Sequence, residues 1–177
     1  MTILPIVIAP DARLKVRCKP VATVDDSVRA KLDAMLATMY DAPGIGLAAP
    51  QVADDRRLVV IDVAREGAPP TPLRLVNPEV LWASSEKVVM SEGCLSLPDV
   101  YYDVKRPERI RAAFLDEAGA RHEIDADGLL ARCIQHEIDH LDGVLFIDHI
   151  SMLKRNMALS KMRKLKAAEA NRRPSRP

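Results

Sequence analysis

The segment QHEIDHLDG, residues 135–143, contains two of the chain's four histidines and could bind a metal ion. His136 and His140 are four residues apart, so on a helix they project from successive turns of one face and can bind one ion together. Glu137 points about 100° further round such a helix, where its carboxylate can reach a water on that ion. The alternative is a chance match, in which two buried histidines are bonded to carboxylates. The five-residue pattern HEIDH favours the metal site but does not exclude this alternative.

A catalytic metal site needs a third protein ligand and an open position. In the zinc peptidase pattern H-E-x-x-H-x-x-G-x-x-H the third ligand lies downstream. Here Gly143 lies three residues after His140, but Phe146 occupies the last ligand position. The one downstream histidine, His149, does not fit that pattern, so the third ligand must come from another segment.

The three cysteines supply other candidates. Cys94 follows Gly93, which permits a close backbone approach, and a thiolate is a strong ligand for Zn²⁺ or Fe²⁺. The alternative for Cys94 is a small buried hydrophobic residue, the commoner fate of a free cysteine. Cys133 shares a helix face with His136 and is expected to pack as a pocket wall. Cys18 is expected to be incidental.

A third segment, GIGLAAPQ at residues 44–51, is rich in small residues. Its backbone can therefore approach a ligand closely, and the amide of Gln51 at its end can donate two hydrogen bonds. It is not a dinucleotide-binding fingerprint, because the third glycine is missing and no strand is expected before it. A plain loop after the first helix is the alternative.

Taken in order, GIGLAAPQ, EGCLS and QHEIDH resemble the three signature motifs of the peptide deformylases, with the approximate spacing of that family. Three intact motifs in one chain of this length make chance implausible. The resemblance spans nearly the whole chain, from the stretch DARLKVRCKPV to a helical C-terminal extension typical of one bacterial branch. It implies a metal-dependent hydrolase that removes the formyl group from the formylmethionine of newly made polypeptides.

The resemblance also implies a role for each residue that matches a motif. The metal ligands would be Cys94, His136 and His140, and Glu137 would be the general base and acid. The oxyanion hole would be formed by the side-chain amide of Gln51 and the backbone N–H of Leu95. The residues that align the substrate backbone would be Ile45, Gly46 and Gly93. The methionine pocket is expected from Met90, Leu129, Cys133 and the aliphatic part of Arg132.

Further positions follow from the same resemblance. Asp139 cannot share the ligand face of the helix, and Arg106 is its expected partner, while Glu92 would brace the ligand loop. Ordinary surface charges are the alternative for all three. Tyr101 and Tyr102, in a segment where family members differ, are candidates to contact the peptide beyond its first residue. One Cys and two His suit Fe²⁺, Zn²⁺, Ni²⁺ or Co²⁺, and the resemblance implies Fe²⁺ in the cell.

The elements that must position these residues follow from periodicity. A helix after TVDDS is predicted, because one apolar stripe is formed by Val28, Leu32, Met35, Leu36 and Met39. Short β-branched or alternating runs between residues 57 and 125 predict strands, with DEAG as a hairpin turn. These runs are RLVVIDV, LRLVNPEV, KVVMS, RIRAAFLD and RHEIDA.

Helical spacing returns from Asp127, where Leu129, Cys133, His136 and His140 share one face, and a last helix is expected over residues 151–168. The predicted fold class is therefore α+β. It consists of mostly antiparallel sheets around a central metal-binding helix, with an N-terminal helix and a C-terminal helix.

Composition limits the other possibilities. The 177 residues, 48% of them hydrophobic, fit a single domain over residues 1–177. Aromatic residues make up 3% of the chain, which disfavours a general reader of nucleic-acid bases. Three cysteines, no apolar run of about 20 residues and no secretory leader predict a cytoplasmic protein.

The C-terminal region from Ser151 onward is distinctly basic, since it holds nine of the 26 Lys and Arg residues and one of the 25 acidic residues. A solvated helix ending in a frayed tail, NRRPSRP, is the simplest interpretation. In this helix the positions that share one face give only a short apolar stripe. They are Leu153, Met157, Ser160 and Lys164. The resemblance implies instead an extension of the catalytic domain, residues 151–177, that docks on the ribosome near the tunnel exit, where phosphates attract it.

Two other functions are weighed against the deformylase. A zinc metalloendopeptidase also uses H-E-x-x-H, but it would need a His or Glu as third ligand and would cleave internal peptide bonds. A non-catalytic RNA-binding protein with a basic tail would be indifferent to chelators and to Glu137→Gln.

Overall fold

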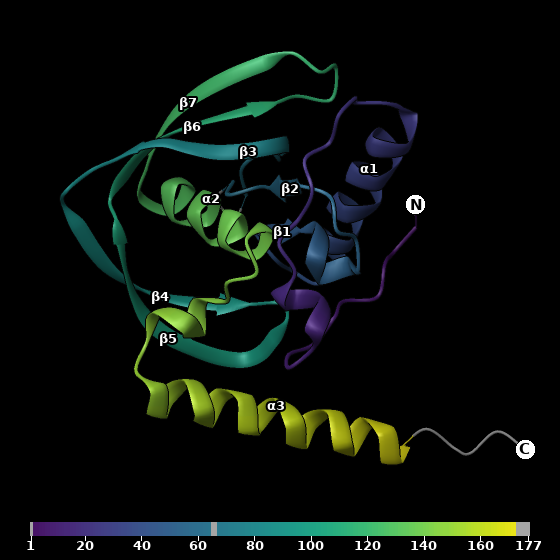
Figure 1. Cartoon of the computed structure of the whole chain (residues 1–177), viewed down its shortest axis with the longest axis vertical. Coiled ribbons are helices and arrows are strands. Elements are labelled where there is room, and N and C mark those ends of the chain that lie inside the picture. The colour runs from purple at the N-terminus through teal and green to yellow at the C-terminus, as the bar shows by residue number, and fades with distance from the viewer. Residues whose placement is uncertain (1, 65–66, 173–177) are drawn as a thin grey trace, which may run out of the picture.

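The computed structural model describes residues 2–64 and 67–172, with three α-helices and seven strands in this part of the chain (Figure 1). The helices are α1 (Asp26–Asp41), α2 (Gly128–Leu141) and α3 (Met152–Arg172). The strands are β1 (Gly46–Ala48), β2 (Leu58–Ile61), β3 (Leu73–Ala83), β4 (Lys87–Cys94), β5 (Leu97–Pro107), β6 (Arg109–Leu115) and β7 (Arg121–Asp127). Short 3₁₀ turns are η1 (Ala12–Lys15), η2 (Ala49–Val52) and η3 (Phe146–His149).

The strands form two antiparallel sheets with α2 between them. One sheet has the order β1-β2-β3-β6-β7, and the other pairs β4 with β5. Figure 1 shows α2 in the space between β3 on one side and β4 and β5 on the other, with α3 beyond β5. The α+β class with a central helix is therefore confirmed.

The apolar core has three parts, and each joins helices to a sheet or turn. The first packs α2 on the five-stranded sheet, where Ile134 and Leu141 meet Val59 and Ile110. The second packs α1 on β1 and β2. The third joins β5, η3 and α3, and it contains Phe146. Because α2 contributes to the first part and lies beside the β4–β5 pair, its position is fixed from two sides.

Helix α1 forms as its sequence predicts. Asp25 is the N-cap, and its carboxylate accepts a hydrogen bond from the backbone N–H of Val28 at 3.0 Å. All five residues of the predicted apolar stripe are buried. The helix ends at Asp41, before Pro43.

The five predicted strand runs correspond to β2, β3, β4, β6 and β7, but two further strands were not predicted. Strand β5 alternates buried and exposed positions from Val100 to Arg106, but its inward positions include a buried arginine and its outward ones an exposed tyrosine. This inverts the usual polarity pattern and hides the period of two. Strand β1 has three residues and is defined by its pairing with β2, which local sequence does not encode.

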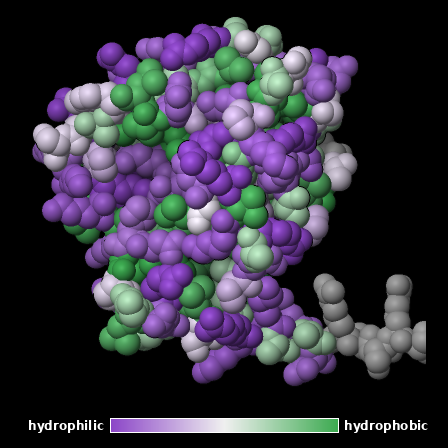
Figure 2. Space-filling model, in the orientation of Figure 1, coloured by the Kyte–Doolittle hydropathy of each residue, from purple (hydrophilic) through white to green (hydrophobic). Residues whose placement is uncertain are grey.

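Helix α3 begins after Ser151, whose side-chain Oγ accepts from the N–H of Lys154 at 3.4 Å. Its expected apolar stripe faces solvent, since Leu153 and Met157 are 71% and 59% exposed, whereas Ala158 and Met162 are buried. Figure 2 shows hydrophilic residues over most of its visible face, with hydrophobic ones near its start. Among the described residues, no helix combines the length and apolar character needed to cross a membrane. The predicted frayed tail, from residue 173 on, lies outside the described residues.

Candidate metal centre and substrate cavity

Three ligand atoms from two elements converge at one point. Cys94 ends β4, while His136 and His140 lie one turn apart on α2. One ligand atom from each residue lies within 4.8 Å of the other two, and the Cys94 Sγ is 3.2 Å from the His140 Nε2. The pairing of β4 with β5 ends beside Cys94 in a register shift, which brings the thiol toward α2.

Glu92 orients the first of the two histidines. Its Oε2 lies 3.0 Å from the Nδ1 of His136, so the Nε2 is the ring nitrogen that remains free to bind a metal ion. Burial disfavours a charged Glu92, but hydrogen bonds from His136 and Arg106 outweigh it and hold the pKa of Glu92 far below its usual range. The carboxylate is therefore ionised and fixes which ring nitrogen of His136 bears the proton.

The donor set fits a divalent transition metal, because a thiolate and two imidazoles suit Fe²⁺, Zn²⁺, Ni²⁺ or Co²⁺. His140 is 1% exposed, and within the described residues its Nδ1 has no hydrogen-bond partner. Burial lowers the pKa of His140 well below its usual value. A neutral imidazole is the form that ligation requires.

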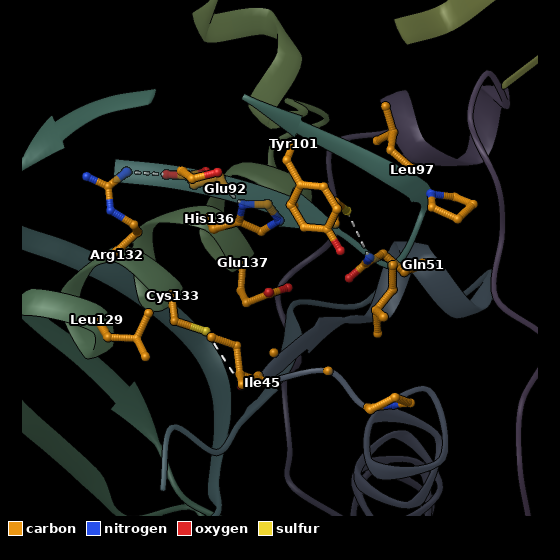
Figure 3. Close-up of a pocket in the computed structure, with 18 of the residues that line it drawn as sticks. Ile45, Gln51, Glu92, Leu97, Tyr101, Leu129, Arg132, Cys133, His136 and Glu137 are labelled. Atoms are coloured by element: carbon orange, nitrogen blue, oxygen red, sulfur yellow. Dashed lines mark hydrogen bonds and ion pairs between the residues drawn. The ribbon is translucent and has the colours of Figure 1, made fainter. Parts of the chain in front are cut away.

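Glu137 lies next to His136 and inside the cavity, as Figure 3 shows. It is 4% exposed, and its Oε2 has no hydrogen-bond partner among the described residues. Burial raises the pKa of Glu137 to about 7. A carboxyl group with a pKa near neutral pH can both accept and donate a proton at that pH.

Gly46 leaves the space that Glu137 occupies. A Cβ at this position would overlap the Oε1 of Glu137 and lie 2.8 Å from the Sγ of Cys133. Only glycine therefore permits β1 to approach α2 this closely.

Gln51, in η2, is 1% exposed and has a fixed amide orientation. Its Oε1 accepts from the N–H of Ala48 at 2.9 Å, and its Nε2 lies 3.2 Å from the Oγ of Ser96 and 3.4 Å from the Sγ of Cys94. The amide NH₂ group therefore faces the ligand cluster (Figure 3).

A cavity of about 430 Å³ opens over these groups, between β1, the β4–β5 pair and α2. Tyr101 stands at its mouth, 69% exposed, with its ring over Gly93. A Cβ at Gly93 would lie 2.5 Å from that ring, so glycine is required for this contact too.

Most residues predicted for the site line this cavity. They are Ile45, Gly46, Gln51, Glu92, Gly93, Cys94, Leu95, Tyr101, Leu129, Arg132, Cys133, His136 and Glu137. Met90, 38% exposed, does not line it. Tyr102 does not line it either, and its ring lies 5.8 Å from the Nζ of Lys154 on α3.

The charges behind the ligands form a connected network. Arg106 donates to Glu92 through Nε at 2.6 Å and Nη2 at 3.0 Å, and to the Oδ2 of Asp139 through Nη1 at 2.8 Å. The Nε2 of His149 lies 2.7 Å from the same Asp139 oxygen. The sequence predicts the Arg106–Asp139 pair. It predicts no role for His149, because the contact between His149 and Asp139 depends on how η3 packs against α2.

Known proteins similar to this chain belong to one family. Residues 3–156 match the family described as polypeptide deformylase. A peptide deformylase of Methylocella silvestris is 56% identical over 183 residues, covering 100% of this chain and 93% of its own. The crystal structure of peptide deformylase from Ehrlichia chaffeensis in complex with actinonin has a TM-score of 0.89 and 42% identity, covering 93% of this chain and 98% of its own. A Met-Ala-Ser-bound class I type b peptide deformylase from Acinetobacter baumannii has a TM-score of 0.79 and 36% identity, covering 84% and 99%.

Proposed function

The chain belongs to the polypeptide deformylase family, hydrolases that remove the formyl group from the N-terminus of nascent polypeptides, and from this premise we propose the role of each residue at its site. The observation that carries the proposal is the convergence of Cys94, His136 and His140 beside a buried Glu137.

Cys94, His136 and His140 would hold one divalent metal ion, which we propose is Fe²⁺ in the cell. When bound, the ion would lower the pKa of a water toward neutrality and polarise the formyl oxygen. Zn²⁺, Ni²⁺ and Co²⁺ suit the same donors.

Glu137 would move the proton. Its carboxylate takes a proton from the attacking water as the new bond to the formyl carbon forms. It then gives that proton to the leaving amine as the C–N bond breaks, so the products are formate and a peptide with a free N-terminus. A pKa of about 7 supports both steps at neutral pH.

The amide NH₂ of Gln51 and the backbone N–H of Leu95 would stabilise the negative charge that develops on the formyl oxygen. The fixed orientation of the Gln51 amide supports this role, because a donor held in place costs no reorganisation during the reaction. Removing one such donor costs roughly 10²–10³ in kcat in other hydrolases.

The peptide would bind as an extended strand between the two sheets. Strand β1 is an edge of the five-stranded sheet, and β4 is an edge of the two-stranded one. Ile45, Gly46 and Gly93 lie along these edges, where backbone groups can pair with a peptide. The methionine side chain would then enter the part of the cavity lined by Leu129 and Cys133.

The test is a comparison of substrates with one ligand variant. The metal-loaded protein should release formate from formyl-Met-Ala-Ser and should not cleave a blocked peptide internally. Cys94→Ser should lose most activity and metal. Internal cleavage would favour a metalloendopeptidase instead, and turnover unaffected by chelators and by Cys94→Ser would refute the metal site.

We also propose that residues 1–177 act as one catalytic domain in the cytoplasm, with α3 as an extension that docks on ribosomal RNA near the tunnel exit. Several cations of α3 already have partners within the protein. Arg155 pairs with Asp148 at 2.8 Å, and Lys166 donates to backbone carbonyls of the N-terminal segment. Arg163 and Lys164 are exposed and form no hydrogen bond or ion pair among the described residues, so they are the cations that phosphates would meet.

Deletion of α3 would be a poor test, because Ala158 and Met162 belong to the core. We expect the double variant R163E/K164E to deformylate formyl-Met-Ala-Ser normally but to bind ribosomes more weakly, with a reduced salt dependence. The matched control is R17E/K87E, which reverses two exposed cations outside α3. Equal ribosome affinity of the two double variants would refute docking through α3.

A further inference from the structure

Arg132 does not behave as a simple wall of the methionine pocket. It is 5% exposed, and its guanidinium is turned toward Glu92 rather than toward Leu129 and Cys133 (Figure 3). Its Nη1 donates to the Oε1 of Glu92 at 2.5 Å and to the carbonyl of Val104 at 3.0 Å. Its Nη2 donates to the carbonyl of Val88 at 3.0 Å.

One side chain therefore links three elements. Val88 lies on β4, Val104 lies on β5, and Arg132 itself lies on α2, one turn before His136. Glu92 lies on β4 two residues before Cys94. The guanidinium thus joins the strand that carries the thiol ligand to the helix that carries the two imidazole ligands.

The carboxylate of Glu92 is shared evenly between its donors. Its Oε1 accepts from Arg106 Nε and Arg132 Nη1, and its Oε2 accepts from Arg106 Nη2 and His136 Nδ1. Without Arg132 the Oε1 would keep one donor, and the carboxylate could rotate about the guanidinium of Arg106. Such a rotation would weaken the bond that orients His136.

We propose that Arg132 is a positioning residue of the metal centre, which holds Glu92 at the angle that directs His136 toward Cys94 and His140. The inference rests on the proposed metal site. Arg132 forms no hydrogen bond to Cys94, His136 or His140 and acts through Glu92.

Arg106 does not make Arg132 redundant. Arg106 lies on β5, its side chain is 5% exposed, and besides Glu92 it binds Asp139, whose side chain is 24% exposed. Arg132 is held by two backbone carbonyls, and its side chain is 6% exposed. The two arginines also balance the charges of Glu92 and Asp139, and loss of either leaves an excess of buried negative charge.

The experiment compares Arg132→Met and Arg132→Lys with the wild type, each loaded with Co²⁺. Co²⁺ affinity is measured by competition with a chelator, and the visible and thiolate charge-transfer absorption reports the ligand geometry. We expect Arg132→Met to weaken Co²⁺ binding by about 10- to 100-fold and to shift the absorption. Arg132→Lys keeps the buried charge and one donor, so it should recover part of both losses.

Leu129→Ala is the matched control, because it alters the cavity wall without touching Glu92. It should raise KM for formyl-Met-Ala-Ser while Co²⁺ affinity and absorption stay unchanged. The Arg132 variants should instead lower kcat together with Co²⁺ affinity. If Arg132→Met does not fold, Arg132→Lys decides: weaker Co²⁺ binding supports the proposal.

Wild-type Co²⁺ affinity and absorption in a folded Arg132→Met would overturn the proposal, as would wild-type values in Arg132→Lys if Arg132→Met does not fold. A change in KM alone would make Arg132 a pocket wall only. Failure of the proposed function would look different. In that case the wild type would not deformylate, although the effect of Arg132 on Co²⁺ binding would remain.

Discussion

Around Glu92 two guanidinium groups and an imidazole surround one carboxylate whose side chain is 4% exposed, whereas the cations of α3 lie at the surface. In α3 the side chains of Arg155 and Lys166 are 37% and 40% exposed. Both regions are rich in charge, but the groups around Glu92 bond mainly to one another, whereas Arg163 and Lys164 on α3 form no hydrogen bond or ion pair among the described residues.

The difference in burial determines what each set of charges can do. Burial of an ion carries a desolvation penalty of several kcal/mol, so the groups around Glu92 are stable only if each keeps all of its partners. Their geometry is then rigid enough to orient a metal ligand. The exposed charges of α3 are screened by salt, and the proposed docking on RNA would act through them.

The strongest test of this contrast is Glu137→Gln, which removes the buried proton carrier but keeps its shape. We expect kcat to fall by about 10²–10⁴-fold, because the amide can neither accept nor return a proton at neutral pH. Formate release from formyl-Met-Ala-Ser measures kcat, and metal analysis should show an unchanged content. Activity within tenfold of the wild type would remove Glu137 from the mechanism.

The next largest effect is expected for Arg106→Ala. It leaves Glu92 and Asp139 without their shared partner in a buried environment, so the free energy of unfolding should fall by about 3–5 kcal/mol. Urea unfolding of the metal-free and metal-loaded proteins measures this, and metal retention should fall as well. Arg155→Ala on α3 is the control and should cost less than about 1 kcal/mol. Equal losses in the two variants would erase the difference between the regions.

A smaller effect on the reaction is expected for Gly46→Ala. The added methyl group overlaps Glu137 and must displace its carboxylate, so kcat/KM should fall by up to about 10²-fold. The metal ligands are not contacted, and metal content should stay unchanged. Gly119→Ala, in the distant β6–β7 turn with φ +81°, is the control and should lower stability by about 1–2 kcal/mol without lowering kcat/KM. A normal rate in Gly46→Ala would mean that β1 can move away from α2.

The residues that meet in the candidate metal centre could be predicted from the sequence. His136, Glu137 and His140 lie on one predicted helix, and Cys94 was reached through its motif. The partners of these residues were less accessible. Arg132 was assigned to the pocket wall from its place on the helix, and its bonds to carbonyls on β4 and β5 depend on how that pair packs against α2.

In the fold, too, the elements with a clear local pattern were predicted and the others were not. Helix α1 and the five predicted strands have periodic patterns and were found. Strand β5 was missed because a buried Arg106 and an exposed Tyr101 invert its polarity, and both have a place in the site. On α3 the apolar residues Leu153 and Met157 face solvent, while the helix packs through Ala158 and Met162. The apolar stripe seen in the sequence is therefore not the face through which this helix packs.

The smallest effect is expected at Asp148, where the exposed charges of α3 meet the body of the protein. Its carboxylate pairs with Lys15 at 2.6 Å and Arg155 at 2.8 Å and accepts from the N–H of Leu145. Burial opposes ionisation, but Lys15 and the Leu145 N–H outweigh it and lower the pKa of Asp148 in the folded state. A lowered pKa stabilises the folded protein at pH values above the unfolded value of about 3.9, and this contribution disappears as the pH falls through the folded pKa.

Asp148→Asn should therefore lower the free energy of unfolding at pH 7, by no more than about 1 kcal/mol because all three side chains are partly exposed. The difference from the wild type should be smaller at pH 3 than at pH 7, because protonation of the carboxylate begins to remove the contribution below about 3.9, and added salt at pH 7 should reduce it too. Urea unfolding at both pH values measures the difference. A loss that persists at low pH would mean that Asp148 acts through packing or the Leu145 hydrogen bond, and the junction of α3 would then resemble the buried network more than the exposed helix.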